Sequence, residues 1–115
     1  MYNLGRDYFL ARRYPEAEAS FREAIAVSDL VDAHNDLGLV LLRTGRAEEA
    51  LRAWTYVVEK KDPAYAPAYF NLGLAYEQMG RAEAARRAVG VYASLAADPA
   101  ERRQAIDWME RLKKK

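Results

Sequence analysis

Side chains that could do chemistry are few in this sequence. His34 is the only histidine and there is no cysteine, which leaves no thiol nucleophile and no cysteine ligand for zinc or an iron–sulfur cluster. Because no second histidine or cysteine exists to complete a site, we interpret His34 as a core or half-buried side chain. Glu48, Glu49 and Asp62 lie at a predicted helix start and in a predicted loop, where acidic side chains complement the helix dipole. We therefore predict no enzymatic activity, no cofactor and no metal site.

The charge and composition fit a folded domain without affinity for a polyanion or a membrane. Of 115 residues, 18 are Lys or Arg, 17 are Asp or Glu and 51% are hydrophobic, which is ordinary globular usage without a large net field. The sequence has no cationic leader followed by an apolar stretch, and no apolar run of about 18 residues. We predict a single domain over 1–115, a cytoplasmic location and, from the alanine- and arginine-rich composition, a bacterial source.

An internal repeat organises the chain. A Leu-Gly pair recurs at intervals of 33 and 35 residues, and an alanine and a large apolar residue follow at the same two intervals. Three landmarks in register predict a helical repeat architecture. The three sets are Leu4-Gly5, Leu37-Gly38 and Leu72-Gly73; Ala17, Ala50 and Ala85; and Phe21, Trp54 and Val89.

Within each repeat the apolar residues have helical spacing, so each repeat is predicted to be two antiparallel helices. Gly45 and Gly80 can end a helix in the left-handed conformation, and Pro15 suits the first turn of a helix. The expected fold is all-α, with seven helices at 1–12, 15–27, 31–43, 47–60, 66–79, 82–96 and 99–112. Repeat one covers 1–30, repeat two 31–65 and repeat three 66–98.

The last predicted helix, 99–112, departs from the repeat and is interpreted as a cap. Asp98 offers an N-cap carboxylate, Pro99 suits the first turn, and Glu101 is placed to close a reciprocal capping box. A stripe of apolar residues then faces one side, which a terminal helix needs in order to cover the end of a repeat stack. The stripe is Ala105, Trp108, Met109 and Leu112. We expect Gly90, inside the preceding helix, to make room for this cap.

The pattern resembles the tetratricopeptide repeat over residues 1 to about 99. The best unit reads Tyr69-x-x-Leu72-Gly73-x-x-Tyr76, followed by Ala85 and Pro99. The resemblance implies a right-handed superhelical solenoid, with Leu72 and Tyr76 filling the hairpin while Gly73 and Ala85 stay small. Met1 aligns with the first aromatic of the family, so the first hairpin is expected to be frayed or the chain to be a segment of a longer solenoid.

The resemblance also implies a concave groove formed by the first helix of every hairpin. Asn3, Asp36 and Asn71 are equivalent in the repeat and form a ladder suited to hydrogen-bonding the main chain of a ligand. The positions that clamp a C-terminal carboxylate in some members carry no cationic pair here, which argues against that ligand. The predicted groove consists of Asn3, Arg6, Phe9, Asn35, Asp36, Leu39, Arg43, Phe70, Asn71, Leu74, Glu77 and Gln78.

The implied function is to bind a partner protein or peptide segment in that groove, without catalysis and without a small-molecule substrate. In the alternative interpretation of the groove, Asn71 satisfies local backbone, and Leu39 and Leu74 contact neighbouring helices. A second functional hypothesis is a self-associating structural or assembly scaffold. A third, suggested by the similar length of pentatricopeptide repeats, is an RNA-binding array, against which the near-zero net charge argues.

Overall fold

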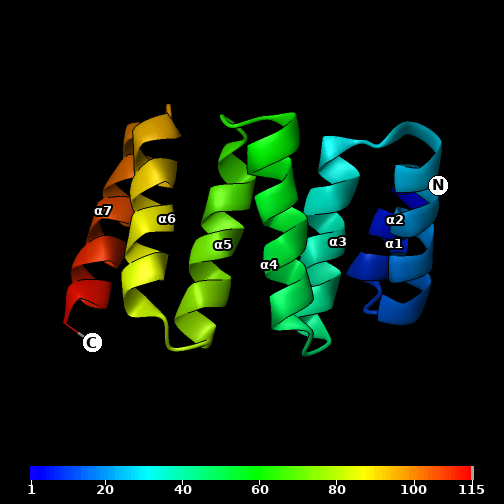
Figure 1. The fold of residues 1–115 in the computed structure, drawn as a ribbon, viewed down its shortest axis with the longest axis horizontal. Helices are drawn as coiled ribbons and strands as arrows, with labels where there is room; N and C mark the ends of the chain where they lie inside the picture. The colour runs from blue at the N-terminus through cyan, green and yellow to red at the C-terminus, as the bar shows by residue number, and fades with distance from the viewer. Residues whose placement is uncertain (115) are drawn as a thin grey trace. The chain divides into compact units, whose positions relative to one another are not determined.

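A computed structural model describes residues 1–114, and these fold into seven α-helices without a strand (Figure 1). The predicted all-α fold and the number of helices are therefore confirmed for the described part of the chain, and the helix ends agree within a few residues. The helices are α1 (Tyr2–Leu10), α2 (Tyr14–Ser28), α3 (Val31–Arg43), α4 (Ala47–Tyr56), α5 (Ala66–Gln78), α6 (Ala82–Leu95) and α7 (Pro99–Lys113).

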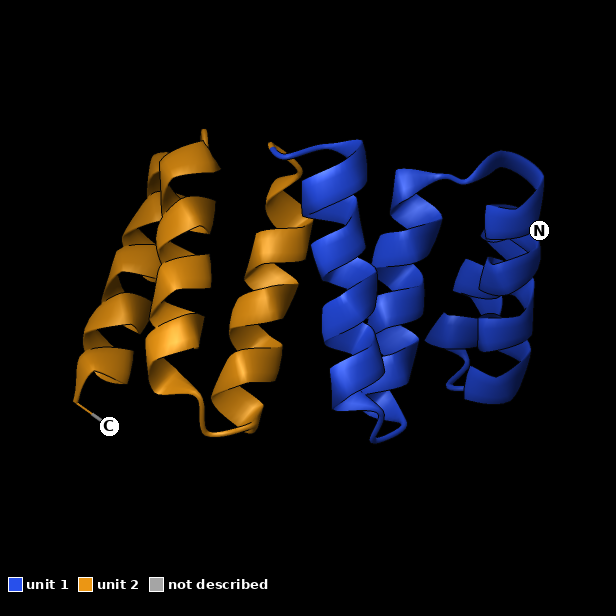
Figure 2. Ribbon diagram, in the orientation of Figure 1, with its two compact units in different colours: residues 1–63 blue, residues 64–115 orange. Residues whose placement is uncertain are grey.

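The chain divides into two compact units (Figure 2). Unit 1, Met1–Pro63, contains α1 to α4 and therefore the first two predicted repeats. Unit 2, Ala64–Lys115, contains α5, α6 and α7, which are the third predicted repeat and the cap. Consecutive helices pack against each other within each unit, as expected for antiparallel hairpins.

The repeated Leu-Gly pair is explained by the close approach of two helices. A Cβ atom built on Gly5 would lie 2.7 Å from the Phe21 ring, and one on Gly73 would lie 2.6 Å from Val89 Cγ2. In unit 1 a Cβ on Gly38 would likewise overlap the Trp54 indole. Each hairpin thus packs the large residue of its second helix onto a glycine of its first helix. The glycine and the large apolar residue of the repeat therefore form one packing contact that is used three times.

The first helix of each hairpin ends with a left-handed residue. Gly45 and Gly80 have φ of 82° and 76°, as predicted, and the first hairpin uses Arg12 with φ of 60° at the same place. The following N–H bonds back across the turn in all three hairpins, for example from Arg13 to the carbonyl of Tyr8 at 2.8 Å. This is the Schellman arrangement, in which glycine is the least strained residue. The left-handed conformation of Arg12 is not among the features predicted from the sequence, although Arg12 lies 33 residues before Gly45.

The predicted helix 47–60 changes its winding before it ends. From Val57 to Lys61 the chain forms a π-helical turn, η1, and the N–H of Asp62 bonds to the carbonyl of Val57 at 2.8 Å. In this turn Lys61 Nζ lies 2.7 Å from Asp29 Oδ2, at the end of α2. A π-turn widens the helix by one residue, and the α-helix predicted to continue to residue 60 ends at Tyr56.

Helix α7 packs on α6 through its predicted apolar stripe. Ala105, Trp108 and Leu112 are buried in one core cluster with residues of α6. The N-cap is confirmed because Asp98 Oδ1 accepts the N–H of Ala100 at 2.9 Å. A Cβ on Gly90 would lie 3.3 Å from Met109 Cε, in agreement with the expectation that this glycine makes room for the cap.

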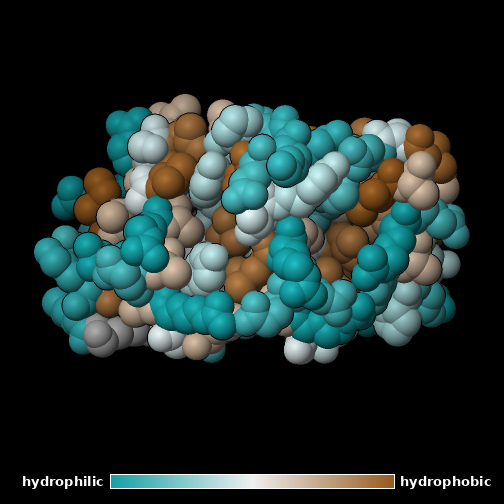
Figure 3. All heavy atoms as spheres, in the orientation of Figure 1, coloured by the Kyte–Doolittle hydropathy of each residue, from teal (hydrophilic) through white to brown (hydrophobic). Residues whose placement is uncertain are grey.

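Hydrophilic side chains cover most of the face seen in Figure 3, and smaller hydrophobic areas lie between them. Many of the charges pair along or between neighbouring helices. In unit 1, Glu18 accepts hydrogen bonds from both Arg22 and Arg46, at 2.9 and 2.7 Å. Among the helices of residues 1–114, none is long and apolar enough to cross a bilayer.

Candidate partner-binding surface

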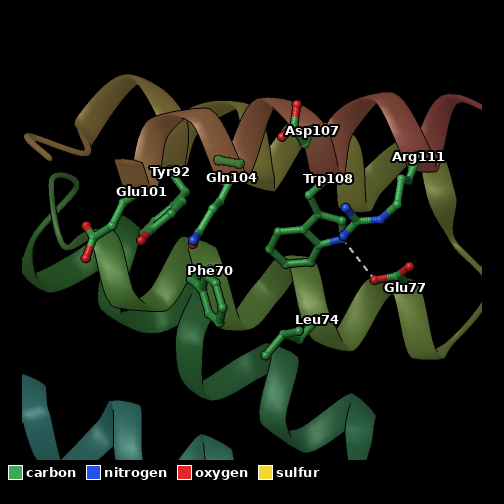
Figure 4. A pocket seen from close by; sticks show the side chains of 10 residues that line it. Phe70, Leu74, Glu77, Tyr92, Glu101, Gln104, Asp107, Trp108 and Arg111 are labelled. Atoms are coloured by element: carbon green, nitrogen blue, oxygen red, sulfur yellow. Dashed lines mark hydrogen bonds between the residues drawn. The ribbon is translucent and has the colours of Figure 1, made fainter. Parts of the chain in front are cut away.

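An open cleft of about 420 Å³ lies between α5, α6 and α7, within unit 2 (Figure 4). We call it the unit 2 cleft. Helix α5 contributes Phe70, Leu74 and Glu77, which follow one another at helical spacing and so share one face. The remaining lining residues are Tyr92 from α6 and Glu101, Gln104, Ala105, Asp107, Trp108 and Arg111 from α7.

The apolar part of the cleft is an aromatic cluster. The Phe70 ring lies with its centroid 5.3 Å from those of Tyr92 and Trp108, edge to face in both pairs. Figure 4 shows Phe70 between the other two rings. Phe70 keeps 36% of its surface exposed, whereas Trp108 is only 7% exposed and belongs to the core. The cleft therefore offers aromatic surface that is held in place from behind by packed side chains.

One hydrogen bond fixes the orientation of the Trp108 indole. Its Nε1 donates to Glu77 Oε1 at 2.9 Å, drawn as the dashed line in Figure 4. A buried indole N–H needs an acceptor, and Glu77 on α5 supplies it across the cleft to α7. Figure 4 shows Arg111 at this end of the cleft, near Trp108 and Glu77. Helix α7 is thereby joined to α5 by a polar contact as well as to α6 by the core.

The opposite end of the cleft is acidic. Burial raises the pKa of the Tyr92 hydroxyl, and the charges of Glu101 and Asp98 raise it further. A phenol is harder to ionise beside carboxylates because the phenolate would be repelled. Glu101, predicted to close a capping box with Asp98, instead acts on Tyr92. This end of the cleft consequently carries a negative potential.

In unit 1, α1 and α3 bring several of the predicted groove residues together. The Tyr2 hydroxyl donates to Asp36 Oδ2 at 2.7 Å. Burial raises the pKa of Asp36, while that hydrogen bond and the charge of Arg6 act in the opposite direction. The Arg43 guanidinium lies 5.3 Å from the centre of the Phe9 ring, a cation–π contact. The α1–α3 face therefore combines an aromatic ring with charges of both signs.

Two predicted groove residues are not on an accessible surface. Asn35 is 7% exposed and Asn71 is 6% exposed. On α3, the backbone carbonyl of Asn35 faces α4, where it accepts the Trp54 indole N–H at 3.0 Å. The three predicted ladder positions therefore differ in exposure, because Asn71 is buried, Asp36 is partly buried and accepts a hydrogen bond from Tyr2, and Asn3 is exposed.

The other predicted residues reach the surface to different degrees. Asn3, Arg6, Arg43, Phe70 and Gln78 are exposed, and Phe9, Asp36, Leu39, Leu74 and Glu77 are partly buried. Of these, Phe70, Leu74 and Glu77 line the unit 2 cleft.

Helix α7 lines the cleft, although no partner-binding role is predicted for it from the sequence. Its stripe of apolar residues was interpreted as a cap alone, yet Gln104, Asp107 and Arg111 line the unit 2 cleft beside Trp108. Each of these residues lies three or four positions from another of them, at 104, 107, 108 and 111. That spacing is a helix face in its own right, and it was the signal available for finding them.

His34 lies in a small polar cluster at the end of α2. Its Nε2 is 2.6 Å from Asp29 Oδ1, and its ring centroid is 4.8 Å from that of Tyr56. Asp29 has φ of 49° and also binds Lys61; the hydrogen bonds from His34 and Lys61 hold the pKa of Asp29 at about 2. Within residues 1–114 no three His, Asp or Glu side chains gather in a way that could hold a metal ion. The cluster ties the end of α2 to α3 and η1.

Comparison with known protein families confirms the repeat that the sequence predicts. The sequence model of the tetratricopeptide repeat matches residues 2–66, and a second model with the same description matches residues 66–89. No curated protein sequence matches the chain.

Solved structures share the fold at low sequence identity. The crystal structure of PcrH from Pseudomonas aeruginosa has a TM-score of 0.88 at 21% identity, over 97% of this chain and 88% of that one. PcrH in complex with the chaperone binding region of PopD gives the same score and identity, over 97% and 87%. SycD, a type III secretion translocator chaperone of Yersinia enterocolitica, has a TM-score of 0.88 at 17% identity, over 97% and 80%.

Proposed function

Because the chain belongs to the tetratricopeptide repeat family, we propose that it is a non-catalytic module that binds a segment of a partner protein. The observation that carries the proposal is the unit 2 cleft, where the exposed ring of Phe70 lies between Tyr92 and Trp108. Exposed aromatic surface set on a rigid core is the usual anchor of a protein interface. The α1–α3 face of unit 1, with Phe9 and Arg43, is proposed as a second contact surface.

The structural neighbours support a chaperone-like role. PcrH was crystallised with the chaperone binding region of PopD, and SycD is described as a translocator chaperone. Both share the fold of this chain at about one-fifth identity, so their partners are not transferred by name. We propose only that this chain, like PcrH in its complex, binds a region of another protein.

The polar clusters of unit 1 connect its structural elements. The cluster around Asp29 joins the end of α2 to α3, α4 and η1 through hydrogen bonds from His34, Tyr56 and Lys61. Each of these contacts connects chain segments within unit 1, so we assign this cluster a structural role. A cytoplasmic location and self-association stay predictions of the sequence.

The test is affinity capture from a cell extract followed by mass spectrometry, with two matched variants. Phe70→Ala removes the exposed ring from the unit 2 cleft, and Val91→Ala truncates an apolar side chain of similar exposure, 39% against 36%, that lies on α6 outside this cleft. We expect Phe70→Ala to lose a specific partner and Val91→Ala to keep it. If both variants retain the same partners as the unmodified protein, the cleft is not the binding surface. Circular dichroism of both variants checks that the fold persists.

A further inference from the structure

We propose that the unit 2 cleft recognises a partner segment in which a lysine or arginine accompanies a large apolar side chain. The inference rests on the proposed function and adds the chemistry of the ligand. It depends on the arrangement of the lining residues, which places an aromatic surface between an acidic end at Glu101 and an end where Glu77 lies with Arg111 (Figure 4).

The apolar residue of the ligand would contact three side chains of the cleft, namely Phe70, Leu74 and Trp108. Phe70 and Leu74 lie one turn apart on α5, and the Trp108 ring closes the space from α7. The cleft volume of about 420 Å³ suits one or two side chains of an extended segment, since whole drug-sized ligands fill sites of about 300–1,000 Å³. A leucine, methionine or aromatic residue of the partner would bury its surface against these three side chains.

The acidic end of the cleft, beside Tyr92, favours a positively charged side chain in the ligand. Glu101 is the acid at the Tyr92 end. Of the other acidic lining residues, Glu77 accepts the Trp108 indole N–H at the far end, and Asp107 Oδ1 lies 3.8 Å from Arg103 Nε. The single cation among the lining residues is Arg111. Arg111 lies at the Glu77 end in Figure 4, away from Glu101 and Tyr92. Arg102, which directly follows Glu101 in the sequence, directs its Nη2 to the Ala96 carbonyl at 2.8 Å. The pKa of Tyr92, raised by Glu101 and Asp98, is consistent with negative potential at this end.

A lysine or arginine of the ligand can contact both the aromatic rings and the carboxylate at the Tyr92 end of the cleft. Its aliphatic stem can lie along the rings of Phe70 and Tyr92, and its charged head can reach the Glu101 carboxylate. An acidic residue in the same place would meet like charge, so the arrangement also rejects a partner of the wrong sign. The occupant is therefore expected to be a basic and apolar peptide segment.

The experiment selects ligands from a phage-displayed library of random short peptides on the full chain, with counter-selection on Phe70→Ala. Selected peptides are then synthesised, and their dissociation constants are measured by fluorescence anisotropy at low and high salt. We expect enriched peptides to carry Lys or Arg beside a large apolar residue. Replacing that cation by glutamine should weaken binding, and added salt should weaken the original peptide more than the substituted one.

Variants of the chain test the acidic partner directly. Glu101→Gln keeps the shape of the side chain and removes its charge, and we expect it to weaken binding of the cationic peptide about 2- to 5-fold. It should leave binding of the glutamine-substituted peptide unchanged. Glu110→Gln is the matched control, because Glu110 is an exposed residue of the same helix that does not line the cleft. Equal affinities for the Glu101→Gln and Glu110→Gln variants would overturn the proposed contact.

The possible outcomes distinguish failure of this inference from failure of the proposed protein-binding function. Peptides that depend on Phe70 but carry no common cation, or an acidic residue, would overturn this inference and leave the proposed protein-binding function standing. If no peptide is enriched over the Phe70→Ala variant, the cleft binds no peptide segment and both proposals fail at this site.

Discussion

Two glycines in unit 2 give a paired test of the packing, because the same substitution is expected to have opposite effects. Gly73 lies inside α5 and Gly90 inside α6. Replacing either by alanine raises helix propensity by about 1 kcal/mol. The two sites differ in what the new methyl group would meet, so the difference in free energy of unfolding between the two variants measures packing alone.

The methyl group at Gly73 would lie 2.6 Å from Val89 Cγ2 and 3.0 Å from Trp108 Cη2. Val89 is fully buried and β-branched, so it cannot rotate away, and overpacking of this kind costs about 1–3 kcal/mol. After the gain in propensity, Gly73→Ala should lose roughly 1 kcal/mol of stability. At Gly90 the nearest atom is Met109 Cε at 3.3 Å, the end of a flexible side chain, so Gly90→Ala should gain about 0.5 kcal/mol.

Urea unfolding followed by circular dichroism at fixed protein concentration measures both variants against the unmodified chain. The expected order of stability is Gly90→Ala, then the unmodified chain, then Gly73→Ala. If Gly73→Ala is as stable as Gly90→Ala, the two helices do not approach as closely as the Leu-Gly packing requires. The explanation of the repeated glycine would then be refuted.

Three further predictions concern helix ends and ionisation. Arg12→Gly should raise stability by about 0.5–1 kcal/mol, because Arg12 holds φ of 60° where glycine is unstrained; unchanged stability in thermal unfolding would contradict this. Asp98→Ala should cost about 0.5–2 kcal/mol by removing the N-cap of α7, and Asp98→Ser should restore most of it in the same measurement. The pKa values of Asp29 and Glu18 are lowered in the folded state, so their contribution to stability is present at neutral pH and is lost as pH falls from about 4.5 towards 2. Unfolding by urea should accordingly become easier over that range, and a constant midpoint would count against these ion pairs.

The helices could be predicted because their signals are local. The 33- and 35-residue intervals, the glycines at 45 and 80 and the proline at 99 fix where helices begin and end. These signals act through backbone conformation, which does not depend on distant contacts. The Leu-Gly packing was predictable for a related reason, since a glycine kept inside a helix against its propensity indicates close approach.

Other features depend on tertiary contacts that the sequence does not display. The residues of η1, Val-Val-Glu-Lys-Lys, carry no mark of a π-turn, and the bond of Lys61 to Asp29 joins positions in different repeats. The burial of Asn71 and the contact of Glu101 with Tyr92 depend likewise on how helices pack. Alignment with a repeat assigns a face to a residue, but the neighbouring helices decide whether that face is open.

The proposal that a partner segment binds in the unit 2 cleft is tested most directly by the two tryptophan indoles. Trp108 Nε1 bonds to Glu77 in the cleft, whereas Trp54 is fully buried in unit 1 and bonds to the Asn35 carbonyl. In a ¹H–¹⁵N spectrum of the full chain, titration with a captured partner segment should shift the Trp108 indole signal in a saturable way and leave the Trp54 signal nearly in place. A segment that binds while the Trp108 signal stays unchanged would show that the cleft is not its site.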